Sequence, residues 1–404
     1  MDAPVTGELG KYRLIAEIAR GGMGIVYLAL MPGPGGFYKT LVVKELKPDY
    51  AHDRSFLAMF LDEARVAAKL HHPNIVQVYE VDNVADRYFI AMEYLEGCTM
   101  RRALKLLKTD FPVGMVVAAL VEVLRGLHHA HELADEAGES MGLVHRDMSP
   151  HNIFLTFEGQ AKIVDFGIVK TRDSQHTEVG VFKGKVAYMP PEQAMPDVTV
   201  DRRADIYAVG VILFEALTGQ RLWTGMQEVH ILASLMKGDI PSIEKVKPSV
   251  PAELKRICSK AMAWNRDDRY ATAEEFREDL EQYYEQARLS VTIRDVGSLL
   301  ARSLETERAK MKTLVDRKIA KLKEGGGHEK VSILPPPSST PQLDADQSGS
   351  ISGFYEERDP ALEKPKLADV VAETESSGLS ATFQKSRLRS FVPQLIVGAS
   401  ILFA

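Results

Sequence analysis

A short stretch of polar residues at fixed spacing constrains the fold of this chain more than any other feature of its sequence. It begins with His-Arg-Asp at 145–147 and continues to Asn152. Thirteen residues after Asn152, the triplet Asp-Phe-Gly at 165–167 follows an apolar run over 161–164. Seven specified residues at these intervals would very rarely arise by chance. We therefore expect the fold to bring their polar side chains together.

The residues before this stretch have the pattern of a β-sheet with one helix. Alternating apolar residues predict strands at five places. They are 12–18, 25–30, 40–46, 75–81 and 88–94. Residues 54–70 carry apolar side chains at helical spacing, and Pro73 ends that helix. We therefore expect residues 12–95 to form a five-stranded sheet with one helix.

The next part of the chain is mostly helical. The pattern predicts long helices at four places. They are 113–131, 201–218, 251–263 and 272–286. A sheet-containing part followed by a helical part over 96–287 places the chain in the α+β class. A polar, glycine-bearing stretch over 131–144 is expected to form a surface loop.

Three segments follow residue 287. A charged helix is expected over 290–323, with apolar residues near one face that pack on the preceding domain. Residues 325–390 are rich in Ser, Gly and Pro and are expected to form a flexible, disordered linker. Residues 391–404 are apolar and follow basic residues, which suits a membrane anchor, but fourteen residues are too few to span a bilayer. A truncated spanning helix, an interfacial anchor and an apolar end that docks on the protein all remain open.

Two features near the N-terminus suit phosphate binding. Gly21 and Gly24 lie in a strand–turn–strand hairpin, where they let the backbone approach a ligand closely. A dinucleotide-binding glycine motif opens a helix instead, which excludes that fold. Lys44 ends an apolar strand, and Glu63 lies on the helix face expected to contact the sheet. A Lys–Glu pair there would hold an ammonium group against phosphates.

With these residues in order, the sequence resembles the eukaryotic-like (Hanks-type) protein kinases, most closely their bacterial serine/threonine branch. The resemblance covers residues 12–287 and includes Pro-Glu at 191–192, close to the A-P-E motif. It implies a bilobal protein-kinase fold with an N-lobe over 12–95 and a C-lobe over 96–287. It also implies ATP and Mg²⁺ as cofactors and proteins as substrates.

The resemblance implies a role for each matching residue. Asp147 would be the catalytic residue that orients the substrate hydroxyl and accepts its proton. Lys44 would hold the ATP phosphates and pair with Glu63, while Asn152 and Asp165 would bind Mg²⁺. The nucleotide would also contact Ala19, Gly21, Gly24, Val26, Glu93 and Leu95, with Met92 as the gatekeeper. Asp205 and the pair of Arg269 with Glu192 would be structural.

The chain departs from the family pattern at three positions. Ala19 replaces the first glycine of the hairpin, which stiffens the loop modestly. Ser149 stands where serine/threonine kinases carry a catalytic lysine, and Lys185 stands where they carry a small hydroxyl residue. We hypothesise that the cation has moved and that Lys185 supplies the ammonium group beside the transferred phosphate. The alternative is that Lys185 points to solvent and that the enzyme is weak.

The segment between Asp165 and Glu192 is the expected place of regulation. Arg146, beside the catalytic aspartate, is a buried cation that needs an anion from this segment. Autophosphorylation is expected first at Thr177, with further candidates at Thr171 and Ser174. The alternative is a constitutive anion from Glu178 or Asp173.

The leading functional prediction is a serine/threonine protein kinase of bacterial signal transduction. The alternatives are a nucleotide-binding pseudokinase that acts as a scaffold and a small-molecule kinase, and tyrosine specificity stays open because Ser149 and Lys185 alter the marker pair. The formal net charge of −6 argues against a nucleic-acid partner. Two isolated cysteines fit a reducing compartment, so we expect a cytoplasmic kinase domain, with tethering to the inner membrane and self-association left open.

Overall fold

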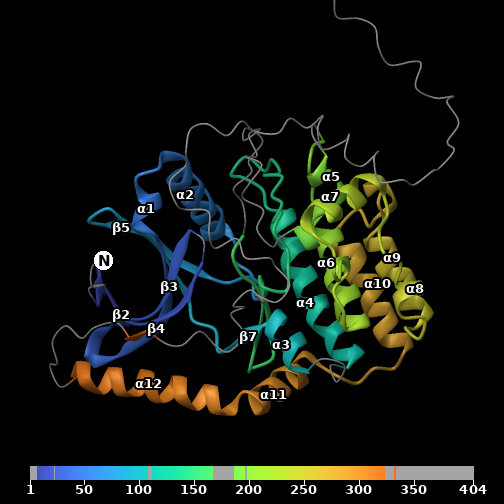
Figure 1. Cartoon of the computed structure of the whole chain (residues 1–404). Coiled ribbons are helices and arrows are strands. Elements are labelled where there is room, and N and C mark those ends of the chain that lie inside the picture. The colour runs from blue at the N-terminus through green and yellow to red at the C-terminus, as the bar shows by residue number, and fades with distance from the viewer. Residues whose placement is uncertain are drawn as a thin grey trace, which may run out of the picture. The chain divides into compact units, whose positions relative to one another are not determined.

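The computed structural model in Figure 1 describes residues 7–21, 23–107, 112–166, 186–195, 198–323 and 332–333. Several predictions fall outside these residues. They concern Lys185, Thr171, Ser174, Thr177, the segment 391–404 and all of the expected linker except 332–333.

The N-lobe is a mainly antiparallel sheet flanked by helices. Its strands are β1 (Glu8–Leu9), β2 (Tyr12–Arg20), β3 (Gly24–Pro32), β4 (Tyr38–Leu46), β5 (Val78–Val84) and β6 (Arg87–Glu93). They are ordered β1-β2-β3-β4-β6-β5, and β10 (Ser332–Ile333) pairs in parallel with β2. The five predicted strands are present, although β5 begins at Val78 rather than at residue 75. The sheet has two more strands than predicted, because strands of two residues show no periodicity.

Helix α2 (Arg54–Lys69) holds Glu63 on its sheet-facing side. Its N-terminus is capped by Asp53, whose carboxylate accepts a hydrogen bond from the amide of Ser55 at 2.8 Å. Three of its residues are buried in a core shared with β4, β5 and β6: Phe60, Ala64 and Ala67. A one-turn helix that the pattern did not predict, α1 (Pro48–Ala51), precedes it.

The C-lobe is built around two buried helices. Its helices are α3 (Met100–Leu107), α4 (Val113–His131), α5 (Pro191–Ala194), α6 (Arg203–Thr218), α7 (Glu228–Lys237), α8 (Ile243–Val246), α9 (Ala252–Ala261) and α10 (Ala273–Gln286). A small sheet of β7 (Gly97–Thr99), β8 (Ile153–Thr156) and β9 (Ala161–Ile163) lies next to α4. Within the described residues, α4 alone has the length and apolarity of a membrane span, and 67% of that stretch is buried inside the protein. Helices α4 and α6 therefore supply the centre of the C-lobe core.

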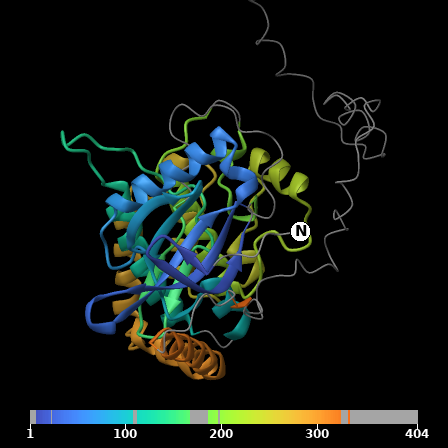
Figure 2. The same cartoon turned by 90° about the vertical axis from the view of Figure 1, so that its left-hand side faces the viewer.

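Of two further predicted regions, the surface loop over 131–144 agrees with the structure and the single helix over 290–323 does not. The loop after α4 projects from the C-lobe, as Figure 2 shows, and Ala134 and Ser140 form a short antiparallel bridge within it. The single helix expected over 290–323 is two helices, α11 (Ile293–Ser303) and α12 (Glu305–Lys323). Leu304 interrupts them with a non-helical backbone, at φ −118° and ψ 22°. Figure 1 shows α11 beside the C-lobe and α12 along the N-lobe sheet.

Candidate active site

Lys44 contacts two carboxylates that come from different parts of the chain. Its Nζ atom lies 2.9 Å from Glu63 Oε1 on α2 and 2.9 Å from Asp165 Oδ1. Lys44 lies in the middle of the sheet, opposite Val26 of β3 and Ile90 of β6. Burial lowers the pKa of its ammonium group, but the charges of Asp165 and Glu63 outweigh burial and leave the pKa above its ordinary value.

The glycine hairpin closes the turn between β2 and β3. The amide of Gly21 donates to the carbonyl of Gly24 at 2.9 Å. A Cβ at Gly24 would lie only 3.0 Å from the carbonyl oxygen of Glu45, which explains the glycine there. Ala19 lies in β2 opposite Val26, just after a shift in the strand register between Glu17 and Ala19.

Asp205 holds the backbone of the loop that carries Asp147. Its carboxylate accepts hydrogen bonds from the amides of His145 and Arg146, both at 2.8 Å, and from His131 Nε2 at 2.8 Å. Burial raises the pKa of Asp205, but the hydrogen bond and charge of His131, with further support from His145, outweigh burial and lower it. These bonds stabilise Arg146 in the left-handed region, at φ +62°, a conformation that costs energy for a non-glycine residue.

Asp147 is held in place by Asn152. The Asn152 Nδ2 atom donates to the backbone carbonyl of Asp147 at 2.7 Å and to its Oδ2 atom at 2.9 Å. The carbonyl of Asn152 in turn accepts a hydrogen bond from the amide of Val164 at 2.9 Å. This bond joins the loop of Asp147 directly to the strand end that precedes Asp165.

The Asp165-Phe166 segment is anchored by ring packing. Phe166 is buried, and its ring lies 4.7 Å from that of His145, measured between centroids. Asp165 has φ +54°, so it is a second strained position of the site, after Arg146. The fold thus brings Lys44, Glu63, Asp147, Asn152 and Asp165 to one place, as the sequence predicted.

The hinge between the lobes, residues 93–95, is held by a lysine side chain that the sequence pattern did not predict. Glu93 Oε1 accepts hydrogen bonds from the Lys162 ammonium and from the amide of Gln77, both at 2.7 Å. Lys162 lies on β9, three residues before Asp165, and is buried. A lysine inside an apolar run could have signalled it, because a buried ammonium group requires an anion.

Glu192 and Arg269 form the buried ion pair that the sequence predicted. Two parallel hydrogen bonds of 2.7 and 2.8 Å join the guanidinium to the carboxylate, and the Arg269 side chain is fully buried. The pair fixes the end of the segment that begins at Asp165 to the C-lobe.

Comparison with known proteins agrees with this geometry. Residues 12–281 match the family model described as the protein kinase domain. The chain belongs to the protein kinase family. It is 43% identical over 284 residues to the tyrosine-protein kinase MasK of Myxococcus xanthus, an alignment that covers 69% of this chain and 44% of MasK. It is 34% identical over 287 residues to the serine/threonine-protein kinase PrkC of Bacillus subtilis, which covers 70% of this chain and 42% of PrkC.

A solved protein kinase has the same fold. The crystal structure of the Mycobacterium tuberculosis PknI kinase domain matches with a TM-score of 0.51 and 27% identity, over 70% of this chain and 99% of that chain. The bilobal protein-kinase fold of this chain is therefore confirmed. The chain spans less than half the length of MasK and of PrkC.

Protein kinases use ATP with Mg²⁺, and the residues present fit the metal ion. Mg²⁺ prefers oxygen ligands, which Asn152 and Asp165 offer through an amide and a carboxylate. Asn152 directs its NH₂ group to Asp147, so its Oδ1 atom is the one that would face a metal ion. In the described part of the chain, no group of three or more His, Cys, Asp or Glu residues is arranged to hold a metal ion.

The position that departs most from the pattern of serine/threonine kinases is buried. Ser149 is only 5% exposed, and its carbonyl accepts a hydrogen bond from the amide of Asn152 at 3.0 Å. Its expected counterpart, Lys185, lies outside the described residues. The proposed exchange of a cation between these two positions stays a prediction.

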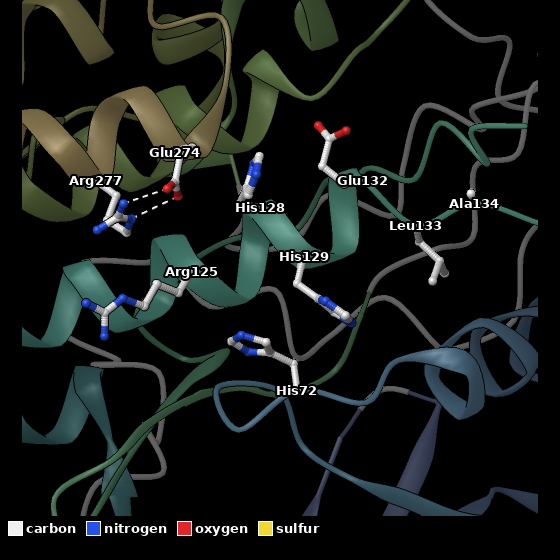
Figure 3. A pocket seen from close by; sticks show the side chains of 9 residues that line it. All are labelled: His72, Arg125, His128, His129, Glu132, Leu133, Ala134, Glu274 and Arg277. Atoms are coloured by element: carbon white, nitrogen blue, oxygen red, sulfur yellow. Dashed lines mark hydrogen bonds and ion pairs between the residues drawn. The ribbon is translucent and has the colours of Figure 1, made fainter. Parts of the chain in front are cut away.

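A separate cavity of about 600 Å³ lies away from these residues, at the end of α4 (Figure 3). His72, from the N-lobe, stacks on His129 of α4 with ring centroids 5.0 Å apart. Arg277 of α10 also lines this cavity, and Glu274 of the same helix pairs with it there. None of the predicted active-site residues lines it.

Proposed function

We propose that this chain is an active protein kinase that transfers the γ-phosphoryl group of ATP to serine and threonine hydroxyls of proteins in bacterial signalling. One observation carries the proposal: Lys44 contacts both Glu63 and Asp165, while Asp147 is held by Asn152. The serine/threonine relatives support the choice of acceptor.

Each residue then has a defined task. Asp147 orients the acceptor hydroxyl and takes its proton at a carboxylate oxygen. Lys44 places its positive charge on the α- and β-phosphates, and Glu63 keeps that ammonium group in position. Asn152 and Asp165 would hold Mg²⁺, which when bound would neutralise charge on the transferred group. Gly21 and Gly24 cover the phosphates, together with Ala19 and Val26, while Glu93 and Leu95 hold the adenine at the hinge.

Tyrosine is the second candidate acceptor. MasK, 43% identical to this chain, is named a tyrosine-protein kinase. Ser149 also replaces the lysine that usually accompanies serine/threonine specificity. Acid hydrolysis of the phosphorylated protein followed by phosphoamino-acid separation decides between the acceptors: phosphoserine and phosphothreonine support the proposal, and phosphotyrosine alone supports the second candidate.

A scaffold without catalysis is the competing class. Ser149 and Ala19 favour it, while the intact contacts of Lys44, Asp147 and Asn152 oppose it. The intact mass of the protein, measured before and after incubation with ATP and Mg²⁺, tests catalysis directly. We expect additions of one or more phosphoryl groups in the native chain and none in Asp147→Asn. A native chain that binds nucleotide and gains no mass would establish the scaffold.

Regulation and placement follow from the same proposal. Autophosphorylation is assigned to Thr177, Thr171 and Ser174, and one copy modifying another would require transient self-association. The kinase domain works in the cytoplasm, where ATP is available, and the apolar segment 391–404 would tether it to the inner membrane.

A further inference from the structure

Helix α11 is anchored in the C-lobe, although it lies beyond the residues that match the family model. Val296 and Leu300 are buried in the C-lobe core. Gly297 crosses Gly159, and a Cβ at Gly297 would lie 2.5 Å from the Gly159 amide nitrogen. The backbones therefore touch, which leaves α11 little freedom to slide.

Helix α12 is anchored in the N-lobe. Leu314, 7% exposed, is buried with residues of β2 and β3, among them Ile15 and Leu28. Further apolar residues of α12 surround this contact: Met311, Val315, Ile319 and Leu322. The covered strands β2 and β3 are the two that the glycine hairpin joins. A shift of α12 would therefore move the two strands that carry the loop expected to cover the phosphates.

The junction between the two helices lies against the hinge. Glu307 pairs with Arg102 at 2.9 Å, and Arg308 lies 3.4 Å from Glu96, just after the hinge. The guanidinium of Arg308 also lies 5.4 Å from the centre of the Phe157 ring. Both ion pairs are partly exposed and contribute little energy. The apolar contacts therefore supply most of the energy that holds the two helices on the lobes, and the ion pairs help to fix their position along the hinge.

Beyond α12, two more residues contact the N-lobe sheet. Ser332 and Ile333 pair with Ala16 and Glu17 of β2 as strand β10. Residues 293–323 thus begin on the C-lobe, pass the hinge and end on the N-lobe sheet, and residues 332–333 pair with that sheet. A change in the angle between the lobes would have to shear these contacts.

We propose that helices α11 and α12, named here the strap, position the two lobes for nucleotide binding, with Leu314 and Gly297 as the positioning residues. The inference deepens the proposed function and rests on it. The strap acts from the side of the hinge, through β2 and β3, and the apolar cluster that it forms there includes none of the residues assigned to ATP. Displacing it should weaken nucleotide binding while the residues of the chemical step stay in place.

The test compares Leu314→Asp with Ala320→Asp, which adds the same charge on the exposed face of the same helix. We expect Leu314→Asp to raise the Kd of a non-hydrolysable ATP analogue and the KM for ATP by about tenfold, because displaced binding groups lose contact. Hydrogen exchange should rise over 12–30, with kcat at saturating ATP less affected. Ala320→Asp and the conservative Leu314→Met should match the native chain.

A second variant keeps the inference falsifiable if Leu314→Asp fails to fold. Gly297→Ala releases the C-lobe end and leaves the α12 contacts intact, and it should weaken analogue binding in the same way. If the targeted helix exchanges freely, α12 in Leu314→Asp or α11 in Gly297→Ala, and the Kd stays native, the inference is overturned. Analogue binding and exchange need no phosphoryl transfer, so a chain that lacks kinase activity would refute the proposed function and still test the strap.

Discussion

The Lys44 ammonium nitrogen lies 2.9 Å from Asp165 Oδ1, so the proposed phosphate-binding cation and a proposed metal ligand contact each other directly. Lys44 stays charged over the whole physiological range, because its carboxylate partners hold its pKa above the ordinary value. We expect Lys44→Met to lower kcat/KM by about 10²-fold or more, since it removes a charge that stabilises the transferred group. Steady-state phosphorylation of a peptide measures this, and circular dichroism checks the fold. Native turnover in Lys44→Met would contradict the assigned role.

Lys185 is predicted to supply the cation that Ser149 cannot. Lys185→Ala should lower kcat by about 10²-fold, because the transferred group loses a nearby positive charge. The Kd for ATP, measured by calorimetry, should stay native, since Lys44 still contacts the nucleotide. The double variant Lys185→Thr with Ser149→Lys, which restores the usual family arrangement, should recover turnover. A Lys185→Ala variant with native kcat would show that this side chain plays no part.

Arg146 is predicted to receive a phosphate from the segment 167–185. Burial lowers the pKa of its guanidinium, with the charge of Asp205 acting in the opposite direction, and in the described residues it forms no ion pair. Thr177→Ala should lower activity by about 5- to 150-fold, the usual range of coupling between two sites. Arg146→Ala should remove the difference between phosphorylated and phosphatase-treated protein. Fully active protein whose phosphopeptide map shows no phosphate at Thr171, Ser174 or Thr177 would favour the constitutive anion.

Arg269 is predicted to be essential for stability rather than for chemistry. Arg269→Met leaves the Glu192 carboxylate buried without its partner, which should lower the free energy of unfolding by about 3–5 kcal/mol. Urea unfolding followed by tryptophan fluorescence measures this. Arg65→Met, at an ion pair with Asp62 in which both side chains are exposed, should cost no more than about 1 kcal/mol and serves as the control. Equal losses in the two variants would show that burial does not decide the contribution.

The stacked histidines of the α4 cavity predict a loss of stability in mild acid. The pKa of His72 is lowered by burial and then by nearby positive charge, chiefly that of His129, and the pKa of His129 is lowered by burial and by His71 and His128. The unfolded chain, with pKa values of about 6.5, therefore binds protons first as the pH falls. The free energy of unfolding should decrease from about pH 7 to pH 5. His129→Gln should flatten that decrease, and an unchanged slope would exclude the pair as its source.

The sequence predicted which residues of the candidate site lie together better than the way in which the fold supports them. Asp147, Asn152 and Asp165 could be identified because their chemistry requires fixed spacing along one loop and one hairpin. The apolar run around Lys162 could have indicated that it needs an anion, but not that the anion is Glu93, which is far away in the chain. Strands β1 and β10 have two residues each, too few for a period, and they form only because β2 offers a free edge.

The strap shows a second limit of sequence patterns. The charged stretch after residue 290 has apolar residues near one face, which predicted packing on the preceding domain but not on which lobe. Helix α11 packs on the C-lobe and α12 packs on the N-lobe, and the non-helical backbone at Leu304 separates them. Information of this kind lies in tertiary contacts rather than in periodicity.

The crossing of Gly159 and Gly297 has a use beyond this molecule. A side chain at either position would force the two backbones apart, since Gly159 also has φ +82° and lies where a Cβ would be 2.5 Å from Arg294 Cα. A genome survey could therefore search for a glycine in the turn after β8 together with a glycine about 140 residues later, in the first helix past the catalytic domain. Chains that carry both glycines would be candidates for the same arrangement, and chains with a bulky residue at either one would have to attach their C-terminal extension elsewhere.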